Sequence, residues 1–290
     1  FFKSIKNYLR ADTLCYLVPD WTNDFDLEHI RKSANSYYDN AAPLPKSIAA
    51  IFSWQASKRF HHELFQSGDF VLVLDAFLGG ISITPVEGIY DKKLFDLIPK
   101  TEGYYWERHP TVTLGDETQA NQMVSTLSDD GCPRADQVLN LFGFDGLSCD
   151  AGKVSIVCVH EWYHLPGTVE SSLTANTLNN HLLDHCRTVL DSISGHTSDN
   201  SVFLLPTSKL IEKPRDPCEF KWIDNELAIL DGAILLAEWQ DIAGDIPLWK
   251  DQLPELSVQI VRNGIYENFF LVEKATVTPQ RGQQVPIPVN

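Results

Sequence analysis

Two stretches of the sequence contain residue types that could do chemistry. In the first, a short apolar run ends in one acid, Asp75, and is followed by the pair Gly79-Gly80 and by a run in which Ser82 and Thr84 alternate with isoleucines. This pattern predicts a β-hairpin with a carboxylate at its mouth. Glycine at the turn lets the backbone approach a ligand closely, including a phosphate. An ordinary hairpin in which Asp75 caps the turn fits the same residues.

The second stretch is an HExxH motif, His160-Glu161-Trp162-Tyr163-His164. On a helix, two histidines four positions apart share one face and can bind zinc, while Glu161 activates the metal-bound water. A third ligand would fall at Glu170. However, the β-branched residues 154–159 predict a strand directly before the motif, and Pro166 lacks the N–H that a helix requires. A zinc metallopeptidase is therefore the alternative function.

The overall charge excludes two classes of partner. The chain has 290 residues, a net charge of -16 and a pI of about 4.8. Such an acidic protein is repelled by nucleic acid and by anionic membranes, so we expect neither as a main partner. No apolar run approaches the length of a membrane span.

The cysteines indicate a reducing compartment. Six are scattered without CxxC spacing, several of them between apolar residues. This usage is typical of reduced, mostly buried thiols in a cytoplasmic protein.

The elements that must position the candidate residues alternate between strands and helices as far as about residue 245. The patterns predict strands at 12–19, 153–159 and 201–205, the hairpin at 70–84, a loop at 40–45, and helices at 25–38, 46–60, 117–127, 176–194 and 225–239. Strand-like segments follow at 256–261, 269–272 and 285–289. This order predicts an α/β layer architecture with an all-β extension that begins at about residue 256.

Four stretches also match a known arrangement in order and rough spacing. They are Cys15–Pro19 with the helix after it, the helix start Pro45-Lys-Ser-Ile-Ala-Ala-Ile-Phe52, the run Val71–Asp75 with Gly79-Gly80, and Val202–Ser208 followed by Asp224–Ala233. Together they resemble the second half of the nucleotide-binding domain of DnaK-type heat-shock chaperones, members of the actin-like ATPase superfamily. In that comparison the second stretch resembles the family's Glu-Pro-Thr-Ala-Ala-Ala helix start, the third its second phosphate loop, and the fourth its adenosine loop and closing helix.

The resemblance implies an α/β, actin-like (ribonuclease-H-like) ATPase lobe over residues 1–245, with an inserted subdomain at about 97–172. The β-rich extension at 256–290 would be the start of a peptide-binding domain or an edge hairpin packed on the body. By this likeness, Asp75 would orient a magnesium cluster and the attacking water. The likeness also implies which residues would face ATP: Gly79, Gly80 and Ser82 the phosphates, and Thr207, Ser208 and Lys209 the adenosine.

The sequence departs from the family at the positions that matter for chemistry. Phe77 and Leu78 stand where the first two glycines of the phosphate loop would fall, and Leu44 stands where the family has an acid that helps to hold magnesium. The adenosine loop has Pro206-Thr207 in place of Gly-Gly, and the first phosphate loop would lie upstream of Phe1.

We therefore predict a chaperone-like cytoplasmic protein with protein clients or partner proteins, which binds ATP and magnesium weakly or not at all and is a weak or inactive ATPase. A non-catalytic protein-interaction scaffold is the third alternative. The nucleotide hypothesis requires the 75–84 hairpin and the 205–209 loop to face one cleft.

Overall fold

The computed structural model describes most of the chain up to residue 115 and several later segments. The described residues are 2–3, 6, 13–22, 24–57, 60, 65–77, 80–115, 147–150, 153–158, 161–164, 181–193, 200–207, 211, 213–215, 219–224, 229–252, 256–262 and 265–272. The helix predicted at 117–127 and the strand predicted at 285–289 lie outside them.

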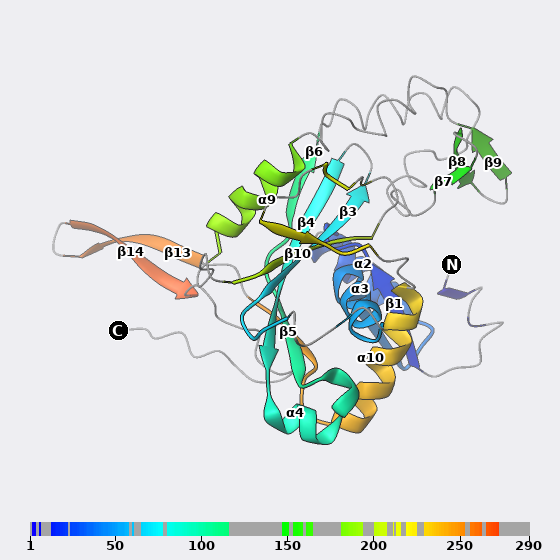
Figure 1. The fold of residues 1–290 in the computed structure, drawn as a ribbon, viewed down its shortest axis with the longest axis horizontal. Coiled ribbons are helices and arrows are strands. Elements are labelled where there is room, and N and C mark those ends of the chain that lie inside the picture. The colour runs from blue at the N-terminus through cyan, green and yellow to red at the C-terminus, as the bar shows by residue number, and fades with distance from the viewer. Residues whose placement is uncertain are drawn as a thin grey trace.

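The centre of the fold is a mixed β-sheet (Figure 1), with the strand order β11-β10-β3-β4-β5-β12. The strands β3, β4 and β5 are antiparallel neighbours, whereas β10 runs parallel to β3, β11 parallel to β10, and β12 parallel to β5. A further strand, β6, pairs with the first part of β4. The bounds are β3 Phe70–Phe77, β4 Gly80–Tyr90, β5 Tyr104–Arg108, β6 Val112–Gly115, β10 Val202–Pro206, β11 Phe220–Trp222 and β12 Trp249–Asp251.

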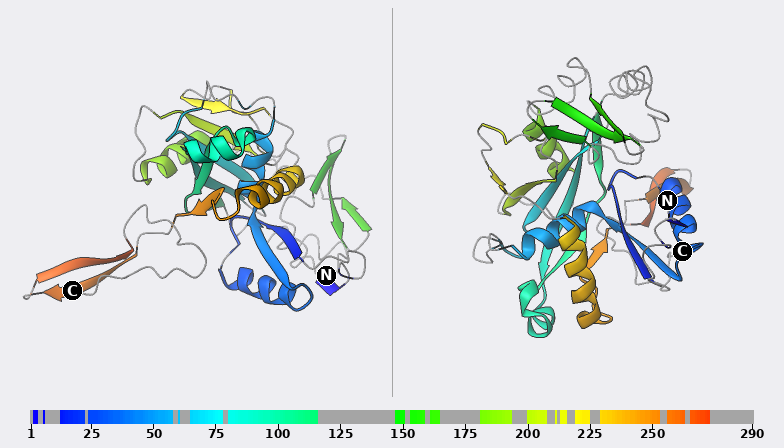
Figure 2. Two further views of the ribbon diagram at one scale, coloured as in Figure 1. Left: turned by 90° about the horizontal axis from the view of Figure 1, so that it is seen from below. Right: turned by 90° about the vertical axis from the view of Figure 1, so that its right-hand side faces the viewer.

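Helices cover both faces of this sheet. Figures 1 and 2 show α3 (Lys46–Gln55) and α10 (Ile229–Ala243) on one face and α9 (Leu182–Asp191) on the other. Further helices are α2 (Asp24–Asn35), α4 (Lys92–Leu97) and the 3-10 turn η1 (Pro99–Thr101). The predicted α/β class is therefore confirmed, as are the hairpin at 70–84 and helices within the ranges 25–38, 46–60 and 176–194; α10 runs four residues beyond the predicted end at 239.

One prediction near the N-terminus is wrong. Residues 40–45, expected to be a loop, form β2 (Asn40–Pro45), which pairs in parallel with β1 (Thr13–Val18) along all six residues. The prolines at 43 and 45 masked the strand in the sequence. They are tolerated because β1 is the one strand that pairs with β2 among the described residues, so the other side of β2 needs no N–H donor there.

The region expected to be an insert divides between two sheets. The strands β5 and β6 pair with β4, so residues 104–115 belong to the central sheet and not to an insert at 97–172. Later residues form a separate three-stranded sheet of β7 (Leu147–Asp150), β8 (Lys153–Cys158) and β9 (Glu161–His164).

The C-terminal strands stand apart from the central sheet. The strands β13 (Leu256–Arg262) and β14 (Ile265–Val272) pair with each other as an antiparallel hairpin. In both figures this hairpin projects away from the helices and the central sheet. Within the described part of the chain, no helix is both long and apolar enough to span a membrane.

The core forms around α3, which is buried on nearly all sides. Every residue of α3 except Ser53 is buried, because the helix lies between the sheet and α10. A helix that is hydrophobic all round is stable only when it is enclosed in this way. Val71 and Val73 of β3 meet α3 in the same core cluster, and strand alternation places Asp75 on that same face.

α10 crosses α3 at Gly232, where the two backbones are in direct contact. A Cβ atom at this position would collide with the carbonyl oxygen of Ala49 and would lie 2.7 Å from the amide nitrogen of Ser53. Since both obstacles are backbone atoms, no side-chain rotation relieves the clash. Only glycine permits this close crossing.

We expect Gly232→Ala to lower the free energy of unfolding by about 2 kcal/mol or more, because the helices must separate and leave poorly packed core between them. Urea denaturation measures the change. The control is Glu238→Ala on the exposed side of α10, which should change the stability by less than about 0.5 kcal/mol. Equal effects of the two substitutions would contradict the close crossing.

Candidate nucleotide-site remnant at the carboxyl ends of β3 and β10

Asp75 lies near the carboxyl end of β3 and is only 4% exposed. Its Oδ1 atom accepts a hydrogen bond from the Lys46 ammonium at 2.7 Å and another from the Thr207 hydroxyl at 2.7 Å. Three elements thus meet at one carboxylate, which is already engaged by two donors.

The fold explains why these three residues meet. β10 runs parallel to β3 with Pro206 opposite Leu74, so the next residue, Thr207, arrives beside Asp75. The Thr207 N–H also donates to the Leu74 carbonyl at 2.8 Å and fixes the chain there. Lys46 is the first residue of α3, because Pro45 ends β2 with a φ of -58° and directs the chain into the helix.

Ser82 completes the same end of the sheet. It lies directly opposite Asp75 in the antiparallel pairing of β3 and β4, so both side chains are on one face. Ser82 is fully buried, and its hydroxyl has no hydrogen-bond partner among the residues that the structure describes. A buried hydroxyl without a partner lowers the stability of the fold. Stability therefore does not explain why a serine is buried at this end of the sheet.

The structure brings together four of the residues predicted to face a nucleotide: Asp75, Ser82, Thr207 and Gly80, the first residue of β4. Gly79, Ser208 and Lys209 lie outside the described residues. The hairpin and the residue after β10 are in contact through the Thr207–Asp75 hydrogen bond, and the predicted common cleft stays a prediction. Leu44, at the position of the family's second acid, is buried in β2 and supplies no ligand.

The arrangement does not fit a magnesium ion at Asp75. Lys46 and Asp75 side chains are each 6% exposed, and the ammonium nitrogen is 2.7 Å from the carboxylate oxygen. A divalent cation that bound this oxygen would face a like charge at close range in a poorly solvated place. The carboxylate is paired with a cation that belongs to the chain.

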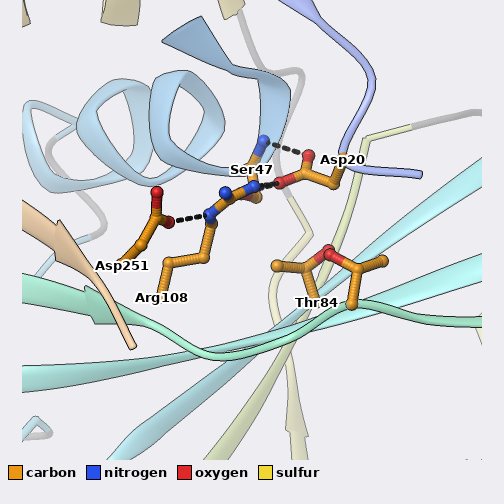
Figure 3. Close-up of polar contacts among 6 residues, drawn as sticks. Asp20, Ser47, Thr84, Arg108 and Asp251 are labelled. Atoms are coloured by element: carbon orange, nitrogen blue, oxygen red, sulfur yellow. Dashed lines mark hydrogen bonds and ion pairs between the residues drawn. The ribbon is translucent and has the colours of Figure 1, made fainter. Parts of the chain in front are cut away.

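A second buried polar group, which the sequence analysis missed, lies at the N-terminus of α3 (Figure 3). Asp20, which follows β1, accepts hydrogen bonds from the Ser47 N–H at 2.8 Å and from the Ser47 hydroxyl at 2.5 Å. Arg108 of β5 reaches Asp20 at 2.9 Å and Asp251 of β12 at 2.5 Å. Asp20 therefore caps α3 from outside the helix and joins the β1–β2 sheet to the central sheet.

Burial and charge act in opposite directions on this group. Burial raises the pKa of the Asp20 carboxyl, and this outweighs the lowering effects of Arg108 and Ser47. Burial also acts to lower the pKa of Arg108, but Asp251 and Asp20 together raise it, so the guanidinium stays charged. Arg108 thus carries one positive charge between two carboxylates.

A cavity of about 420 Å³ opens beside Arg108, between the β1–β2 sheet and the strands β5 and β12. Its lining is mixed, with Asp20, Arg108 and Asp251 beside apolar side chains that include Leu27 and Trp249. The cavity does not include Asp75, Ser82 or Thr207 among its lining residues. It is therefore separate from the predicted nucleotide residues.

The alternative zinc site fails on its backbone. Glu161–His164 form β9, which pairs antiparallel with β8, and the motif is not on a helix. Four of the five motif residues are therefore in extended backbone, whereas the HExxH arrangement needs a helix to bring its two histidines onto one face. His160 and Glu170 lie outside the described residues, within which there is no group of three or more potential metal ligands.

No protein-family model matches the sequence, and no curated protein matches it either. Among solved structures the chain is similar to the actin-like ATPases MamK and MreB. A double helical filament of MamK is 12% identical with a TM-score of 0.41, and a non-polymerising MamK mutant bound to AMPPNP is 11% identical with a TM-score of 0.36; each match covers 82% of this chain and 73% of the other. MreB 5 of Spiroplasma citri bound to AMPPNP is 8% identical with a TM-score of 0.41, over 85% of this chain and 78% of the other.

The raised pKa of Asp20 gives a pH-dependent prediction. A carboxyl whose pKa is raised on folding favours the folded state while it is protonated, and this contribution is lost as the pH rises through the raised pKa. Asp20→Asn cannot ionise and keeps a side-chain oxygen for the Ser47 N–H. We therefore expect the stability of Asp20→Asn relative to the original chain to increase between about pH 4 and pH 7, by about 1.4 kcal/mol for each unit by which the pKa is raised.

Urea denaturation at several pH values measures this difference. The exposed variant Asp231→Asn corrects for the loss of one acidic group from an acidic chain. A stability difference that stays constant with pH after this correction would show that folding does not raise the pKa of Asp20.

Proposed function

We propose that the chain is a chaperone-like protein built on an actin-like lobe whose nucleotide binding and hydrolysis are weak or absent. The strand order supports the lobe: an antiparallel β3–β4–β5 unit is followed by β10 in parallel beside β3, then β11 in parallel beside β10, and finally α10. This is the arrangement expected of the ribonuclease-H-like fold that the sequence resemblance implies.

The observation that carries the proposal is the state of Asp75. In an α/β sheet, ligands bind beyond the carboxyl ends of the parallel strands, and Asp75 and Thr207 meet at that place on β3 and β10. Yet the carboxylate is buried and bonded to Lys46 and Thr207. Asp75 therefore has the position of a nucleotide-site acid, but its carboxylate oxygen is already bonded to Lys46 and Thr207 and is not available to orient a metal or a water molecule.

ATP and magnesium are therefore doubtful ligands. Were ATP to bind, Asp75, Gly79, Gly80 and Ser82 would face the phosphates, and Thr207, Ser208 and Lys209 the adenosine. The Thr207 hydroxyl donates to Asp75 or to the Leu74 carbonyl, which leaves it less available to a nucleotide.

Protein clients are the partners that this proposal assigns. The β13–β14 hairpin projects from the body and exposes apolar side chains, among them the cross-strand pair Val261 and Tyr266, which are 61% and 71% exposed. Exposed apolar pairs on a strand surface fit extended, apolar segments of other proteins. Cys15 and Cys186 are free cysteines, which is compatible with a reducing, cytoplasmic location. A protein-interaction scaffold without client binding is the alternative.

The purified chain should bind ATP with a Kd weaker than about 1 mM and should hydrolyse it no faster than protein-free buffer with magnesium. Isothermal titration calorimetry and a phosphate-release assay measure the two properties. Asp75→Asn should leave both unchanged, because the carboxylate is already occupied. Hydrolysis that the original chain performs and Asp75→Asn loses would overturn the proposal.

The client role is tested by light scattering from a reduced, unfolding protein mixed with the chain. We expect the chain to suppress aggregation and the double variant Val261→Ser/Tyr266→Ser to suppress it at least about threefold less, because the apolar pair is lost. The matched control is Leu230→Ser/Ile234→Ser, since these residues on α10 are similarly exposed, at 68% and 57%. No suppression by any form, or equal loss in both variants, would favour the scaffold.

A further inference from the structure

Lys46 occupies an unfavourable place for a lysine. It is 4% exposed, and it is in the first turn of α3, where the helix dipole disfavours a positive charge. A buried ammonium without compensation is among the most costly groups in a protein. Asp75, at 2.7 Å from the lysine nitrogen, supplies the opposite charge.

The atoms around the ammonium have the chemistry of a hard-cation site. The Asp75 carboxylate and the Thr207 hydroxyl are 2.7 Å apart, and Thr207 also lies 3.1 Å from the Leu74 carbonyl oxygen. The buried Ser82 hydroxyl, which has no partner among the described residues, is on the same face of the sheet, opposite Asp75. All of these are oxygen atoms, which are the ligands that Mg²⁺ and Mn²⁺ prefer.

We propose that Lys46 is a built-in cation that takes the place of a divalent metal at Asp75. It stands where the resembling chaperones have the threonine of Glu-Pro-Thr, so a single residue supplies the charge that a bound ion would otherwise bring. The inference rests on the proposed function, since it explains why this actin-like lobe needs no metal at Asp75. It follows that a neutral residue at position 46 creates a divalent-cation site from Asp75, Thr207 and Ser82.

The test is a titration of the full chain with Mn²⁺ in the absence of nucleotide. Electron paramagnetic resonance measures the concentration of free Mn²⁺ at each step. Lys46→Met replaces the lysine with an apolar side chain of similar length and so removes the positive charge. We expect this variant to bind Mn²⁺ at least about tenfold more tightly than the original chain. A folded Lys46→Met variant with no gain in affinity overturns the proposal.

Two further variants show where the ion binds. Lys46→Arg keeps a cation beside Asp75 and should show no gain, and Lys46→Met/Asp75→Asn removes both charges and should lose the gain. If Lys46→Met folds poorly, circular dichroism with and without about 1 mM Mn²⁺ replaces the titration, and the metal should restore the fold. Failure of Mn²⁺ to restore it, while the double variant folds, contradicts the proposal.

Failure of this inference and failure of the proposed function give different results. Mn²⁺ binding by the original chain that is lost in Asp75→Asn would show that Lys46 does not replace the metal. ATP hydrolysis that the original chain performs and Asp75→Asn loses would overturn the proposed function whatever the Lys46 variants bind.

Discussion

The burial of α3 is the constraint on which the rest of the structure depends. Every residue of this helix except Ser53 is buried, and the helix is enclosed by the sheet, by α10 and by the β1–β2 sheet. Enclosure forces the backbone contact at Gly232 and also buries the N-terminus of the helix. Buried helix ends need partners for their free N–H groups, and Asp20 supplies one of them from another segment of the chain.

Two buried carboxylates, Asp20 and Asp75, flank this helix start, and each is balanced by a cation from the chain itself. Arg108 balances Asp20, and Lys46 balances Asp75. Such pairs stabilise a fold little compared with apolar packing, but the loss of one partner leaves an uncompensated charge that costs about 3–5 kcal/mol. The pairs therefore hold specific elements in register more than they add to stability, and both of them attach α3 to its surroundings.

Patterns that depend on neighbours in the sequence were predictable. The hairpin around Asp75 and the helix around Gly232 have clear periodicity, and the meeting of Asp75 with Thr207 followed from the resemblance. The Asp20–Arg108–Asp251 group was not predictable, because its pairs are 88 and 143 residues apart and no spacing marks them. β2 was missed because its prolines suggest a loop, and the HExxH residues were a match of residue types on the wrong backbone. Lys46 was missed because a lysine at a helix start is expected to be at the surface.

Under the proposed function, Lys46 would also explain how an α/β lobe of this kind remains stable without a metal at Asp75. A metal-binding acid that loses its metal becomes an unpaired buried charge, which destabilises the core in which it lies. An ammonium group from the adjacent helix removes that cost without any change in strand order, because the carboxylate and the Thr207 hydroxyl keep their places. Under the proposed function, weak or absent catalysis and a stable lobe would both follow from the same buried ion pair.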